Sequence, residues 1–142
     1  MMLRVIFQIV VFQIYTIPLA IAIHSSLDCT WQFIDQPLSH FERGATAERV
    51  LKQRLCIYDK YWKSNSTLPI FLYTGNESPV EEYVNNTGLL WTLAEKHSAL
   101  VIFAEHRYFG ESMPEIENLS NCISYLNVAE VGRHTTYSCK IK

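Results

Sequence analysis

"FLYTGNES", residues 71–78, and "VIFAEHRYFGES", residues 101–112, share one pattern. Each begins as a run of apolar, β-branched or aromatic residues and ends abruptly in glycine and charge. A short apolar run bounded in this way is typical of a buried strand, and the polar residues that follow are typical of a functional loop. The two stretches therefore predict buried strands over residues 68–74 and 99–104, each leading into a candidate site loop.

A helix is predicted between these strands, in "NNTGLLWTLAEKH", residues 85–97. Asn86 or Thr87 can cap its start. Its predicted apolar face consists of Leu89, Leu90, Leu93 and Ala94. The order strand, helix, strand predicts a right-handed crossover between parallel strands. Because both strands are apolar on both faces, we expect an α/β fold with a mostly parallel, helix-covered sheet. Ligands of such sheets bind at the carboxyl ends of the strands, where both loops lie.

Two further strands are predicted upstream. "CTWQFIDQPLSHF", residues 29–41, has the alternating, aromatic-rich character of an early strand. "RVLKQRLCIYDKYW", residues 49–62, is also predicted to be extended. Its expected core contacts are Val50, Leu55, Ile57 and Tyr58. The polar residues 63–67 predict a turn.

The N-terminus predicts a cleaved signal peptide over residues 1–22. Arg4 precedes a long apolar stretch that ends in the small residues 20–22, Ala-Ile-Ala, a pattern that signal peptidase cleaves. We therefore expect a secreted chain that starts near Ile23. The alternative is an uncleaved signal anchor, because the apolar run approaches the length of a membrane span.

Cysteines and glycosylation sequons agree with a secreted chain. The four cysteines are Cys29, Cys56, Cys122 and Cys139. An even number in a secreted protein predicts at least one disulfide. The three possible pairings stay open, and free buried thiols are the alternative. Sequons of the form N-x-[ST] begin at Asn65, Asn76, Asn85 and Asn118.

The composition excludes several classes of partner. The 142 residues are enough for one domain, and the formal net charge is −2. There is no basic patch of the kind that binds nucleic acid. Neither CxxC nor HExxH occurs, so no metal and no other cofactor is expected. The oligomeric state is left open.

Several motifs in a fixed order carry a family resemblance. "TGNE", "NNTG", "WTLAE" and "FAEHRYFGES" follow one another, with "QPLSHF" and "KQRL" before them and "NCISYLNVAE" after them. Over residues 31–130 the chain resembles the N-terminal part of the lysosomal Pro-X carboxypeptidase and dipeptidyl peptidase II family of serine peptidases. The resemblance implies an α/β-hydrolase fold with a Ser-Asp-His triad and a secreted or lysosomal location. It also implies that the substrates are peptides with proline, which lose a C-terminal residue or an N-terminal dipeptide.

The implied nucleophile is missing from the chain, so no catalytic residue is assigned. Such a serine lies in a G-x-S-x-G elbow, whereas residues 110–114 read Gly-Glu-Ser-Met-Pro. Ser112 is therefore expected to be a turn-forming loop residue. We interpret residues 23–130 as the N-terminal part of a peptidase domain. Residues 131–142 are interpreted as a divergent, disordered tail in which His134 has no catalytic role.

The resemblance suggests a role for the first loop. One oxyanion-hole donor of such enzymes comes from the loop after the corresponding strand. Gly75, Asn76 and Glu77 occupy that loop and are candidates for the oxyanion loop or the substrate pocket. Glu77 is read as a structural acid or a contact for a substrate's terminal amine. The family continues this motif as "TGNEG", whereas Ser78 and a proline follow here. The alternative is that "TGNES" is merely a tight turn.

The second loop is read as a scaffold beside the site. Its residues are Glu105, His106, Arg107, Tyr108, Gly110 and Glu111. Charged groups directly after a buried strand must pair or form hydrogen bonds, so we expect an ion pair of Arg107 with Glu105 or Glu111. The alternative role is direct contact with the substrate.

Three functions follow from these observations. The first is an N-terminal fragment of a serine exopeptidase that cleaves next to proline and is inactive alone. The second is a non-catalytic secreted binding or regulatory module, and the third is a signal-anchored glycoprotein. If the elbow strand is missing, residues 99–104 should form an uncovered apolar edge. The isolated chain should then be poorly soluble, or persist only with a partner that completes the sheet.

Overall fold

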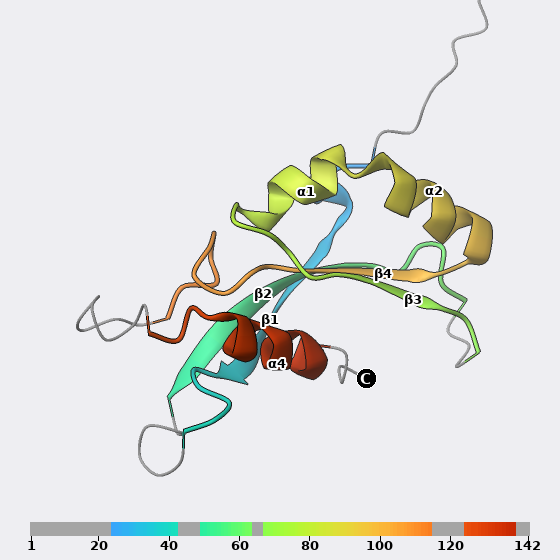
Figure 1. The fold of residues 1–142 in the computed structure, drawn as a ribbon. Coiled ribbons are helices and arrows are strands. Elements are labelled where there is room, and N and C mark those ends of the chain that lie inside the picture. The colour runs from blue at the N-terminus through green and yellow to red at the C-terminus, as the bar shows by residue number, and fades with distance from the viewer. Residues whose placement is uncertain (1–23, 43–48, 64–66, 115–123, 139–142) are drawn as a thin grey trace, which may run out of the picture.

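The computed structural model describes residues 24–42, 49–63, 67–114 and 124–138 (Figure 1). In chain order the elements are η1 (Ser26–Asp28), β1 (Thr30–Pro37), β2 (Val50–Tyr58), β3 (Ile70–Tyr73), α1 (Val80–Asn86), α2 (Gly88–His97), β4 (Leu100–Ala104) and α4 (Val128–Ser138). Several predictions lie outside the described residues: the signal peptide, Asn65, Asn118, Cys122 and Cys139. Within the described ranges, no helix has the length and apolar character needed to cross a membrane.

The four strands form one mixed sheet in the order β1-β2-β4-β3. β3 and β4 are parallel, which confirms the predicted strand-helix-strand unit. β2, however, runs antiparallel to both of its neighbours, β1 and β4. The expectation of a mostly parallel sheet is therefore wrong for this part of the chain. The apolar pattern of one strand reports that both of its faces are covered, but it does not report the direction of its neighbours.

β4 lies inside the sheet, not at its edge. It pairs with β2 on one side and with β3 on the other, and its residues Val101 to Ala104 are buried. The expected uncovered edge at residues 99–104 is therefore wrong. Among the described strands the outer one next to β4 is β3, whose four residues carry no charge.

Helices α1 and α2 cover one face of the sheet (Figure 1). α2 confirms the predicted helix, and its expected apolar face is confirmed in part, because Ala94 is buried and Leu90 packs against the core. Trp91 and Ala94 are buried, whereas Leu89 is 72% exposed. The phase of α2 is set by Trp91, which packs against Phe103 of β4 and donates its indole N–H to the carbonyl of Val84 in α1 (3.0 Å). α1 was not expected from the sequence.

Apolar side chains are buried on both faces of the sheet. On the face under α1 and α2 the buried cluster is Cys56, Tyr58, Val80, Val84, Trp91, Ala94, Ala99, Val101 and Phe103. On the other face it is Leu55, Ile102 and Ala104. Of the predicted core residues of β2, Leu55 and Tyr58 are buried and Ile57 is partly buried. Val50 is 52% exposed, so its assignment to the core is wrong.

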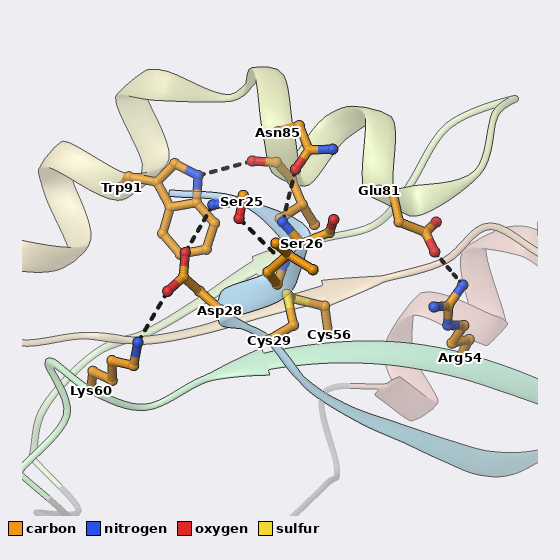
Figure 2. Close-up of a disulfide and its surroundings, with 12 residues drawn as sticks. Ser25, Ser26, Asp28, Cys29, Arg54, Cys56, Lys60, Glu81, Asn85 and Trp91 are labelled. Carbon is orange, nitrogen blue, oxygen red and sulfur yellow. Dashed lines mark hydrogen bonds and ion pairs between the residues drawn. A yellow bond between two sulfur atoms is a disulfide. The ribbon is translucent and has the colours of Figure 1, made fainter. Parts of the chain in front are cut away.

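Cys29 and Cys56 form a disulfide, which confirms the prediction of at least one (Figure 2). The bond joins the residue before β1 to a buried position in β2. Close to it, the backbone N–H of Ser26 donates to the side chain of Asn85 in α1 (2.8 Å). The segment that leads into β1 is therefore attached both to the sheet and to the helical layer.

α4 extends into the region predicted to be a disordered tail. Its backbone is helical to Ser138, so the prediction of disorder is wrong for residues 131–138. Near its start, the buried carboxylate of Glu130 accepts hydrogen bonds from the hydroxyl of Ser39 (2.6 Å) and the backbone N–H of His40 (2.7 Å). These contacts attach α4 to the segment that follows β1.

Candidate functional site

The exits of β3 and β4 touch each other, as expected for neighbouring parallel strands. Gly75 follows β3 and has a φ of +73°. A Cβ atom on Gly75 would lie 2.5 Å from the backbone nitrogen of His106 and 2.6 Å from the carbonyl oxygen of Ala104. Both the left-handed backbone and the close approach require glycine here.

The residues after Gly75 form a tight turn that is exposed to solvent. The side-chain oxygen of Asn76 accepts the backbone N–H of Glu77 (2.9 Å), and the carbonyl of Asn76 accepts the backbone N–H of Ser78 (2.8 Å). The Ser78 hydroxyl donates to Glu82 at the start of α1 (2.7 Å). The amides of Glu77 and Ser78 are therefore both used in hydrogen bonds within the turn.

Glu105 directly follows β4 and is completely buried. Its carboxylate accepts the backbone N–H of Val80 (3.1 Å), the backbone N–H of Glu111 (2.9 Å) and the hydroxyl of Ser112 (2.8 Å). A Cβ atom on Gly110, whose φ is +53°, would overlap this carboxylate. Glu105 therefore occupies a closed space between the start of α1 and the loop after β4.

Arg107 is also completely buried, but it faces a different part of the molecule. Its guanidinium forms an ion pair with Glu130 (3.7 Å) and donates to the carbonyls of Leu38 (2.6 Å) and Tyr125 (3.4 Å). The expected ion pair of Arg107 with Glu105 or Glu111 is therefore wrong. The regular strand ends at Ala104, so the side chains that follow are free to turn toward different elements.

Sequence reasoning missed the partners of Arg107. Its partners Leu38, Tyr125 and Glu130 lie far from it in the chain. The motifs that contain them, "QPLSHF" and "NCISYLNVAE", do not indicate what they contact. Burial is the main cause that lowers the pKa of the His40 ring below its ordinary value, and the nearby charge of Arg107 lowers it further. Glu130 opposes this shift, and Arg133 adds to it. Together these groups fasten α4 to the segment after β1.

The remaining scaffold candidates line the same loop. Nδ1 of His106 donates to the carbonyl of Arg107 (2.8 Å), and the imidazole ring faces Phe109 edge-on. Tyr108 has a φ of +73°, a conformation that is uncommon for a residue other than glycine. The side chain of Glu111 is exposed. Within the described ranges, no group of three or more His, Cys, Asp or Glu side chains is arranged to hold a metal.

Ser112 is completely buried and takes part in the packing of this loop. Its hydroxyl donates to Glu105 (2.8 Å) and accepts the backbone N–H of Arg54 in β2 (2.9 Å). Its carbonyl accepts the backbone N–H of Tyr108 (2.9 Å). The oxygen of Ser112 is thus occupied by structural hydrogen bonds and is not presented to a substrate.

Arg54 connects the sheet to α1, which the sequence analysis did not foresee. Its guanidinium forms an ion pair with Glu81 in the first turn of α1 (Figure 2) and stacks on the ring of Trp31 with 3.8 Å to the centroid. Arg54 thereby helps to hold the helix that follows the Gly75 turn.

An open hollow of about 450 Å³ lies beside the end of the β1–β2 pair at which Pro37 faces Val50. Its walls are formed by Phe33, Leu38, Arg49, Val50, Lys52, Glu111 and Met113. None of the candidate residues of the first loop lines it, and Glu111 is the one scaffold candidate among its walls.

Comparison with known proteins links the chain to one family. The family model described as "Serine carboxypeptidase S28" matches residues 36–132. The chain is 46% identical over 83 residues to the lysosomal Pro-X carboxypeptidase of Bos taurus. The matched segment covers 58% of this chain and 16% of the relative. The chain is 41% identical over 95 residues to the enzyme of the same name from Homo sapiens, covering 67% of this chain and 18% of the relative. It is 34% identical over 82 residues to the thymus-specific serine protease of Mus musculus, and this match covers 58% of this chain and 16% of the relative. The chain thus spans less than a fifth of the length of these relatives.

Proposed function

The chain belongs to the serine carboxypeptidase S28 family, and from this premise we propose that it supplies the N-terminal part of a serine exopeptidase that cleaves peptides next to proline. Carboxypeptidase and dipeptidyl peptidase activity are both compatible with this role, and the name Pro-X carboxypeptidase of several relatives favours the first. The activity belongs to the complete enzyme, and this chain alone is inactive.

The observation that carries the proposal is the position of the Gly75 turn. It follows a parallel strand, contacts the exit of the neighbouring strand, and carries amides that are not all used inside the turn. In α/β-hydrolases, one oxyanion-hole donor comes from the loop at this point of the fold. We assign this donor to the amide of Gly75 or Asn76. We propose that Glu77, which is exposed beside them, contacts the substrate.

The nucleophile comes from a further strand that pairs with β3. The order β1-β2-β4-β3 leaves β3 as an outer strand among those described. A parallel strand added there would end beside the Gly75 turn, because the carboxyl ends of parallel strands meet at one edge of the sheet. A G-x-S-x-G elbow at the end of that strand would bring its serine to the oxyanion donors. This arrangement completes an α/β-hydrolase sheet.

The residues after β4 act as the scaffold of this site and not as its chemistry. Glu105 and Arg107 are buried among structural partners, and the hydroxyl of Ser112 is engaged by Glu105 and Arg54. A nucleophilic serine needs an adjacent base and an exposed oxygen. We therefore assign no catalytic residue to this chain, and no metal or cofactor. A secreted or lysosomal location follows from the expected signal peptide and from the names of the relatives.

A segment exchange tests the proposal. Residues 36–132 replace the matching segment of the bovine lysosomal Pro-X carboxypeptidase, and release of the C-terminal residue from Pro-X peptides is measured. We expect the exchanged enzyme to be active and a Gly75→Val variant of it to lose about a hundredfold or more in kcat, because the oxyanion donor is displaced. Gly88→Ala is the matched control, since a Cβ atom at Gly88 meets nothing within 4 Å.

Two results would contradict the proposal. One is a folded but inactive exchanged enzyme. The other is hydrolysis of Pro-containing peptides by the purified chain alone that disappears in a Ser112→Ala variant, which would identify Ser112 as a nucleophile.

A further inference from the structure

We infer that the carboxylate of Glu105 is the positioning residue that joins the Gly75 turn and the loop after β4 into one unit. The inference rests on the proposed function, because it concerns the loop to which the oxyanion donor is assigned. It concerns Glu105 alone among the three consecutive polar residues 105–107. Arg107 holds α4, and the ring of His106 contacts its own loop.

The donors to Glu105 come from three separate positions. Val80 is the first residue of α1, directly after the Gly75 turn. Glu111 and Ser112 belong to the loop after β4. Through Ser112, whose hydroxyl also accepts the backbone N–H of Arg54, the same network reaches β2. One buried carboxylate therefore holds both loops and the sheet beneath them.

The energetics make these contacts interdependent. A buried carboxylate is costly unless its oxygens are satisfied by hydrogen bonds. The donors that the structure shows for Glu105 are two backbone amides and one hydroxyl, all of them neutral. If one loop moves away, the carboxylate loses a donor that no solvent molecule replaces easily at a fully buried position. Movement of the Gly75 turn and movement of the loop after β4 are thus penalised through the same group.

The Gly75 turn is fixed at both of its ends as a result. At its start, Gly75 packs on the backbone of His106. At its end, Val80 donates to Glu105. The direction of the Gly75 and Asn76 amides is set between these two points. Gly110 is also required for this arrangement, because only glycine at this position leaves room for the Glu105 carboxylate.

Hydrogen exchange with single-residue resolution tests the inference on the intact chain. Glu105→Gln keeps the volume of the side chain but replaces one acceptor oxygen by an N–H donor. We expect exchange to rise about tenfold or more at Val80 and at Glu111 together, as for the loss of hydrogen bonds to a charged group. The amides that pair β1 with β2 should change by less than about twofold. Glu111→Gln, which changes an exposed carboxylate in the same loop, is the control. It should leave the protection factors of both sites unchanged once the altered intrinsic exchange rate at residue 111 is corrected for.

Ser112→Ala gives an independent reading if Glu105→Gln does not fold. It removes one donor to Glu105 and should also raise the exchange of Val80, whose amide bonds to the other oxygen of the same carboxylate. An increase confined to one loop, or an equal increase throughout the sheet, would overturn the inference. The segment exchange described above can fail while the two loops still open together. In that case the proposed function is wrong and the coupling through Glu105 stands.

Discussion

Gly75 and His106 are in backbone contact across the parallel pair, so closely that a Cβ atom on Gly75 would lie 2.5 Å from the His106 nitrogen. Gly75 follows β3 and His106 follows β4, and helices α1 and α2 lie between these two strands in the sequence. The two loops at this edge of the sheet therefore share one boundary, and a change in either backbone is transmitted to the other.

Gly75→Ala should destabilise the chain by about 1–3 kcal/mol, because the new methyl group meets backbone atoms and the left-handed φ disfavours a side chain. Urea unfolding followed by circular dichroism measures the effect. Gly88→Ala is the control and should change the free energy of unfolding by less than about 1 kcal/mol, since the position is open. Equal effects of the two variants would show that the contact with His106 is not constraining.

Loss of the Cys29–Cys56 disulfide should cost about 3 kcal/mol of unfolding free energy. The bond closes a loop between positions 27 residues apart, and the cost reflects the larger conformational freedom of the unfolded chain without it. The measurement compares the midpoint of urea unfolding with and without a reducing agent. A Cys29→Ala, Cys56→Ala double variant should reproduce the reduced state, and an unchanged midpoint would contradict the prediction.

Acidification should weaken the attachment of α4 through His40. The pKa of His40 is lowered in the folded chain from its ordinary value of 6.5, first by burial. The folded state therefore disfavours the protonated ring, and stability is lost as the pH falls below about 6.5. We expect the urea midpoint to be lower at pH 5 than at pH 7.5, and His40→Gln to remove this part of the pH dependence. The pKa of Asp28 is also lowered, chiefly by the backbone N–H of Ser25. Protonation of Asp28 therefore affects stability only in more acidic solution. A wild-type midpoint equal at both pH values would contradict the assignment.

Glu130→Ala should destabilise the chain by about 3–5 kcal/mol. It leaves the buried guanidinium of Arg107 without its ion-pair partner and removes the acceptor of Ser39, and breaking one side of a buried ion pair is costly. Thermal or urea unfolding measures the loss. Glu111→Ala, at an exposed position outside this network, is the control and should be within about 0.5 kcal/mol of the wild type.

The outer strand β3 should make the isolated chain associate. Ile70 is 53% exposed, and the strand has no charge that would oppose pairing with another strand. We expect concentration-dependent association in sedimentation velocity, reduced by Ile70→Lys. Leu27→Lys, at an exposed position away from the sheet, is the control. A monomeric wild type with a cooperative thermal transition would favour the alternative of an independent secreted binding module.

Local sequence chemistry was sufficient for several features of this protein. The strand-helix-strand unit, its parallel pairing, the presence of a disulfide and the family all followed from short stretches. Each of these features leaves a signal in short stretches or in the number of cysteines, so periodicity, motif order and cysteine count report them directly. Gly75 is an example, because a glycine at the end of an apolar run already indicates a loop or turn.

Only the tertiary structure decided the features that depend on residues far apart in the chain. Nothing near Arg107 in the sequence indicates that Glu130 is its partner, and the phase of α2 depends on Trp91 meeting Phe103. The direction of β2 and the outer position of β3 likewise depend on which strands meet. Hydrophobicity determines that a strand is buried but not what lies beside it, because burial is non-directional and pairing is not.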